Sequence, residues 1–202
     1  LLAQARVDAD RAEALRAESI ELLEPITRGN SKSSEGYLLQ AIATRESGGD
    51  SERCEWLLKQ AKKTTDKRGD RISRIRVERA LLGVVQGNLD QSESALRDLI
   101  AKDMSNARLF MALATVLEAR QQYIPAHAEL LRASERTPPN SLLRREVEAH
   151  LGRIQAIIEA QAAGTFVPPP MPVAAAAEEP ATADHNRVIR RKKKGEKKII
   201  WT

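Results

Sequence analysis

The sequence predicts an all-α protein, a short helical-hairpin solenoid of roughly three repeats with a closing helix and a disordered C-terminal tail. Three observations lead to this prediction. Ala, Leu, Glu, Arg and Gln are abundant, and all of them favour helix. Aromatic residues, which usually populate the strands of sandwiches and barrels, make up only 3% of the 202 residues. Apolar residues recur three and four positions apart between polar turns, and no stretch alternates strictly enough to indicate a sheet.

A helix within residues 8–28 is the first predicted element, because its apolar residues follow helical spacing. We expect it to be one helix of a truncated leading unit. A pair of helices follows, on either side of a Gly-Gly turn at residues 48–50. The residues that mark these two helices are Leu39, Ile42 and Ala43 in the first and Cys54, Leu58 and Ala61 in the second.

The next pair of helices flanks the turn at residues 87–90. Its first helix is marked by Val77, Ala80, Leu81 and Val84, and its second by Leu89, Ser92 and Leu96. The first helix of this pair aligns best with the first helix of the following unit when the alignment is shifted by one residue. We therefore expect the turn within this pair to be one residue shorter than in the following unit. The distance in sequence from the preceding pair is four residues longer than a strict 34-residue repeat. We expect these four extra residues in the loop over residues 62–70.

The clearest unit spans the 34 residues from Ala107 to Asn140. Its pattern is Phe110-x2-Leu113-Ala114-x2-Leu117, then Tyr123, then Ala126-x3-Leu130-x2-Ala133, then Pro138. Large residues at this spacing fill the space between two helices, and small residues let the helices approach where they cross. Proline ends the second helix because it has no N–H to donate. This unit closely resembles the tetratricopeptide repeat, and the two earlier pairs are similar to it with less regularity.

A closing helix is predicted over residues 141–163, from an apolar stripe that includes Val147 and Ile154. Asn140 or Ser141 can cap its first turn, and Gly164 can end it. Repeat stacks need such a helix, because the last hairpin otherwise leaves an apolar face in water.

Three regions are therefore predicted: a tetratricopeptide-like domain over 1–164, a Pro/Ala-rich linker over 165–186 and a basic tail over 187–202. The formal net charge of the chain is +5, yet the tail alone holds eight basic residues against one acid. Its candidate contact residues, for a polyanion or a partner, are Arg187, Arg190, Arg191, Lys192, Lys193, Lys194, Lys197, Lys198 and Trp201. Nucleic acid or an acidic protein fits this charge better than an anionic membrane surface, and a localisation signal is a further alternative.

The sequence gives little indication of a catalytic or metal site. The three histidines lie on separate elements, the single cysteine, Cys54, stands at a packing position, and no phosphate-binding glycine loop or metal motif is present. We therefore expect no enzyme activity, no cofactor and no metal. No apolar run is long enough to span a bilayer and no targeting leader is visible, so we expect the protein in the cytoplasm.

The resemblance to tetratricopeptide repeats implies a function in binding. In that family the first helices of the pairs line a concave groove that holds an extended peptide or a partner helix. On the best-matched unit, this places Arg108, Met111, Thr115 and Glu118 on the groove side. We expect a scaffold that binds a partner protein there and tethers through its tail. A subunit of a ribonucleoprotein and an envelope or secretion-system assembly protein are the alternatives.

Overall fold

The computed structural model describes residues 2, 11–28, 32–65 and 70–167, and all of their regular secondary structure is helical. The prediction of an all-α protein is confirmed. The eight helices of this part of the chain are α2 (Ala12–Thr27), α3 (Ser34–Glu46), α4 (Ser51–Thr64), α5 (Asp70–Val85), α6 (Leu89–Lys102), α7 (Ala107–Ala119), α8 (Tyr123–Glu135) and α9 (Leu142–Ala162).

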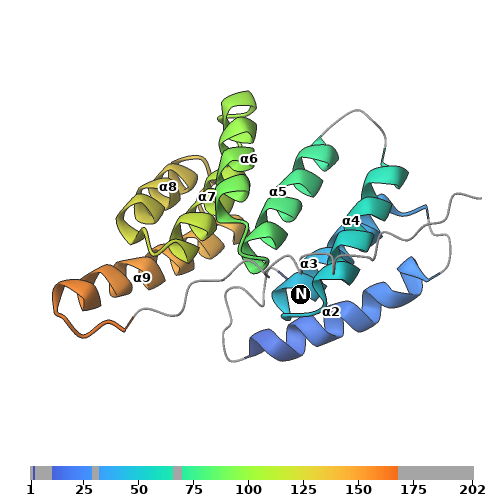
Figure 1. Ribbon diagram of the computed structural model, residues 1–202, viewed down its shortest axis with the longest axis horizontal. Coiled ribbons are helices and arrows are strands. Elements are labelled where there is room, and N and C mark those ends of the chain that lie inside the picture. Colours follow the sequence, from blue (N-terminus) through green and yellow to red (C-terminus); the bar gives the residue numbers. More distant parts are fainter. Residues whose placement is uncertain (1, 3–10, 29–31, 66–69, 168–202) are drawn as a thin grey trace, which may run out of the picture.

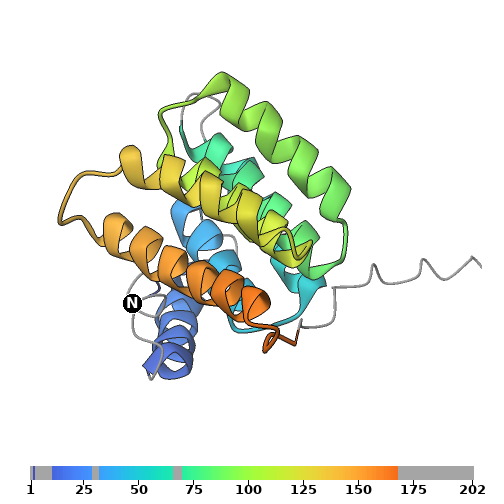
Figure 2. The same ribbon diagram turned by 90° about the vertical axis from the view of Figure 1, so that its left-hand side faces the viewer.

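The helices form a stack in which each one packs against the next along the chain. Three hairpins, α3/α4, α5/α6 and α7/α8, lie between α2 at one end and α9 at the other, as Figure 1 shows along the long axis. The first helices of the hairpins also touch one another, since α5 contacts both α3 and α7. Figure 2 shows the same stack from its α9 end. This arrangement matches a helical-repeat solenoid.

The turns within the hairpins repeat with the period of the sequence. Gly87 has a φ of 78° and Gln121 has a φ of 61°, and these two left-handed residues stand at equivalent places in the second and third hairpins. Glycine suits that conformation because it has no Cβ. Each of these turns has three residues, 86–88 and 120–122. The expectation of a shorter turn in the second hairpin is therefore wrong.

In the second hairpin several of the predicted core positions are buried, and its first helix, α5, is longer than the first helix of the third hairpin, α7. Val77 and Ala80 are buried as predicted, whereas Arg76 and Arg79 are exposed on the same helix. The four additional residues are not all in the loop: α5 has 16 residues where α7 has 13. An extra helical turn satisfies its own backbone hydrogen bonds, which a longer loop does not.

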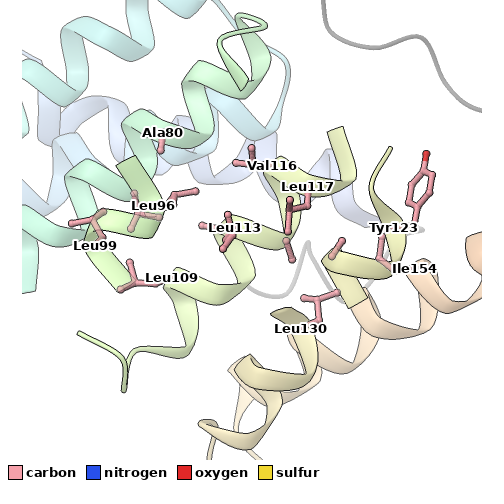
Figure 3. Packing of buried hydrophobic residues seen from close by; sticks show 14 residues of the cluster. Ala80, Leu96, Leu99, Leu109, Leu113, Val116, Leu117, Tyr123, Leu130 and Ile154 are labelled. Carbon is pink, nitrogen blue, oxygen red and sulfur yellow. The ribbon is translucent and has the colours of Figure 1, made fainter. Parts of the chain in front are cut away.

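The core centres on α7, which is buried along most of its length. Leu113 and Leu117 pack with Leu130 of α8 and Ile154 of α9, as Figure 3 shows. Ala126 is fully buried, as the predicted crossing of α7 and α8 requires. A second core joins α3, α4 and α5, and it includes the buried Cys54.

The helix ends follow the predicted signals. Ser141 caps α9 by accepting a hydrogen bond from the backbone N–H of Arg144 at 3.1 Å. Gly164, with a φ of 70°, follows the end of the same helix. The packed chain continues past this residue, because the ring of Phe166 stacks edge-on against Tyr123 at 5.5 Å between ring centres. The greater part of the predicted linker and the whole basic tail lie outside the described residues.

Candidate partner-binding groove

A groove of about 1160 Å³ runs across the first helices of the stack. Its lining comes from α3, α5, α7 and α9, from the segment that precedes α7, and from Leu2. In each hairpin the first helix faces the groove, while the second helix packs behind it. The groove is therefore a property of the stack and not of any single hairpin.

Three of the four predicted groove residues, Arg108, Met111 and Thr115, line this groove on α7. Arg108 is exposed at the start of the helix, and Met111 and Thr115 are half-buried. The hydroxyl of Thr115 donates a hydrogen bond to the carbonyl of Met111 at 3.1 Å, so its polar atom is satisfied within the helix. These residues expose an open, mixed surface of one guanidinium and two mainly apolar side chains.

The fourth residue, Glu118, binds neighbouring side chains at the α7–α9 side of the groove. Its Oε2 lies 2.8 Å from Nε2 of His150 and 2.9 Å from Nη2 of Arg153. Burial raises the pKa of Glu118, but the hydrogen bond from His150 and the charges of Arg153 and His150 lower this pKa more, so it falls below its ordinary value. His150 and Arg153 line the groove on α9.

His150 is a groove residue that the sequence analysis missed. It stands 32 residues after its partner Glu118, close to one repeat length. Because successive first helices lie side by side in such a stack, residues about one repeat apart are neighbours. Complementary charges about one repeat length apart in the sequence are therefore the signal that could have indicated the Glu118–His150 pair.

A second set of charges joins the first helices at the other end of the groove. Arg45 of α3 places Nη2 3.0 Å from Oε2 of Glu78 on α5 and 3.2 Å from Oε1 of Glu46. All three side chains are largely buried and line the groove. These contacts hold α3 against α5 as the Glu118 contacts hold α7 against α9.

The groove floor between these two charged sets is apolar. Val77 and Leu81 of α5 meet Met111 and Ala112 of α7 there. Within residues 70–85 and 107–119, no ion pair joins α5 to α7. The groove therefore has an apolar patch between α5 and α7, among polar and charged lining residues that include Arg74 and Glu146.

The histidines and the cysteine of the described residues do not gather at one place. No group of three or more His, Cys, Asp or Glu side chains among them is placed to hold a metal ion. His127 lies half-buried on α8, and burial raises the pKa of the Cys54 thiol, which disfavours the reactive thiolate. Within the same part of the chain, no helix is both long enough and apolar enough to cross a bilayer.

The nine tail residues that the sequence nominates, from Arg187 to Trp201, lie outside the described residues. Comparison with protein-family models, with curated proteins and with solved structures found no match to this chain.

Proposed function

We propose that this protein is a non-enzymatic scaffold that binds a segment of a partner protein in the groove of its first helices. The observation that carries the proposal is the shared groove itself, with its apolar floor between α5 and α7 and its paired charges on either side. Apolar side chains of a partner gain by leaving water at such a floor, and polar groups at the flanks fix the register.

The shape of the groove favours a peptide segment over a small molecule. It is open, and it extends across four helices that come from separate parts of the chain. Concave surfaces of stacked helical repeats bind extended or helical segments in this way. The stack of helix pairs leads us to propose that the chain is a divergent member of the tetratricopeptide repeat family. Its expected location in the cytoplasm stays a prediction from the sequence.

Selection from a random peptide library tests the groove. The full chain serves as bait, and the affinity of each selected peptide is then measured by fluorescence anisotropy. We expect Met111→Asp, which places a charge on the floor, to weaken binding at least tenfold. Leu131→Asp is the matched control, since Leu131 is 47% exposed on α8 and does not line the groove. Peptides that bind both variants and the wild type equally would contradict the proposal.

The basic tail extends the proposal to a second partner, a polyanion. Eight basic residues within 12 positions attract phosphates through the release of counterions. RNA association within a ribonucleoprotein is the second candidate function, because this charge favours nucleic acid. Engagement of six to eight phosphates of a single strand gives a log–log salt slope of roughly −4 to −6.

Deletion of residues 187–202 tests the tail. We expect the full chain to bind a heparin column and the shortened chain to elute near the void volume. A titration of single-stranded RNA at several salt concentrations then gives the slope. Unchanged retention after deletion would exclude the tail as the polyanion-binding segment.

A further inference from the structure

Leu2 lies in the groove although it is ten residues away from the start of α2. It is helical and half-buried, it packs against the core that joins α3, α4 and α5, and it lines the groove together with Leu39. Each other lining residue comes from the hairpins, their connections or α9. One leucine from a separate part of the chain is thus placed on the concave surface.

The surroundings of Leu2 explain why a leucine is favoured there. Leu39 and Ile42 of α3 form the adjoining apolar lining, and Val77 and Leu81 continue it on α5. The same end of the groove carries the Arg45, Glu46 and Glu78 set, whose charges bind one another. An apolar side chain loses contact with water at this place without separating a charged pair.

We propose that Leu2 is a built-in occupant of the α3–α5 end of the groove, and that a leucine-bearing segment of the partner binds there by displacing it. This proposal rests on the proposed function. It adds that the groove recognises a leucine side chain of the partner, and that displacement of Leu2 controls access to the α3–α5 end. Arg108, Met111 and Thr115 stay open on α7 while Leu2 is in place. A partner therefore makes its first contact at α7 and reaches the α3–α5 end only when Leu2 leaves.

The test supplies the same leucine from a separate molecule. The probe is a synthetic peptide with the sequence of residues 1–11, labelled at its C-terminus with fluorescein and titrated with the full chain. We expect the Leu2→Asp chain to bind this probe at least tenfold more tightly than the wild type, because its own side chain no longer competes. Leu22→Asp is the matched control: Leu22 is 59% exposed on α2, and its variant should behave like the wild type.

A second probe identifies the recognised side chain. The same peptide carrying Leu2→Asp should bind the Leu2→Asp chain at least tenfold more weakly than the unchanged peptide. If the charged side chain compromises folding of the full chain, Leu2→Ala replaces it, with an expected gain in affinity of at least threefold.

Several results would overturn the inference. Equal affinity of the wild type and the Leu2 variants shows that Leu2 does not compete, and absence of peptide binding to either shows that the groove does not accept this leucine. A lower melting temperature with no gain in binding makes Leu2 a structural residue only. If the library peptides still lose affinity on Met111→Asp, the groove function survives any of these results and the role of Leu2 alone is rejected.

Discussion

Glu118 and His150 stand on different helices, 32 residues apart, and their side chains meet at 2.8 Å beside the groove. The contact joins the first helix of the last hairpin to the closing helix. Arg153 binds the same carboxylate oxygen, so one acid holds two groups of α9. The residue that the sequence assigns to partner binding thus joins α7 to α9 beside the groove.

Glu118→Gln should lower the free energy of unfolding by roughly 1 to 2 kcal/mol at neutral pH, since the carboxylate is charged and its contact with His150 is largely shielded from water. Chemical denaturation followed by circular dichroism measures the change. Glu148→Gln is the control, because Glu148 forms an exposed pair with Arg144 within α9, and such pairs contribute about 0.5 kcal/mol or less.

The same pair predicts a pH dependence. A carboxyl whose pKa is lower in the folded state stabilises the fold above its unfolded pKa and loses that effect as pH falls through the folded pKa. The difference in stability between wild type and Glu118→Gln should therefore shrink as the pH falls below 4.5, the ordinary pKa of the carboxyl. A difference that grows on acidification would contradict this assignment.

Gly83→Ala should destabilise the second hairpin. A Cβ at this position would lie closer to the Ser92 hydroxyl than van der Waals contact allows, where α5 and α6 cross. Overpacking of this kind costs roughly 1 to 3 kcal/mol, of which the higher helix propensity of alanine offsets about 1 kcal/mol. Ser92→Ala removes the clashing oxygen, so the double variant should recover most of the loss in a double-mutant cycle.

Gly152→Ala provides the opposite expectation for the same substitution. Nothing lies within 4 Å of a Cβ added there, in the exposed part of α9. Alanine favours helix over glycine by about 1 kcal/mol, so this variant should be more stable than the wild type. If both glycine variants shift the melting temperature in the same direction, the close approach at Gly83 is not as described.

Leu130→Ala should be among the most damaging single changes. Leu130 is fully buried between α7 and α8, and its truncation leaves a cavity that costs about 2 to 5 kcal/mol. Its neighbour Leu131 is 47% exposed on the outer side of α8, and Leu131→Ala should change stability by about 0.5 kcal/mol or less. Urea unfolding of the two variants gives the comparison. Similar losses in the free energy of unfolding would mean that α8 is rotated about its axis relative to the structure described.

Phe166→Ala should also destabilise the fold, by roughly 0.5 to 2 kcal/mol, since the ring loses its edge-on contact with Tyr123 and its apolar burial. A chain ending at residue 167 should therefore melt at a higher temperature than one ending at 164. Equal melting temperatures would show that the packed domain ends with α9, as the predicted boundary has it.

The hairpins were predictable because their signals are local. Each signal lies within a single repeat. They are the spacing of Leu113, Leu117 and Leu130, the small residue Ala126 at the helix crossing, and Gly87 in its turn. The helix pairs, the closing helix and its Ser141 cap follow from these signals. The extra turn of α5 was missed, because polar residues at the start of a helix resemble those of a loop.

The groove required knowledge of how hairpins stack. Arg108, Met111 and Thr115 were found through the resemblance to a repeat family, which supplies the side of the helix that faces inward. The contacts of His150 with Glu118 and of Arg45 with Glu78 join residues about one repeat apart, so nothing in either helix alone indicates them. The place of Leu2 depends on the folded stack and had no local signal.

Hydrogen exchange of the full chain with and without a library-selected peptide tests the groove most directly. First and second helices alternate along the chain, so binding in the groove predicts alternating protection. Exchange should slow in α3, α5, α7 and α9 and stay unchanged in α4, α6 and α8. Protection that falls instead on the outer helices α4, α6 and α8 would contradict the account.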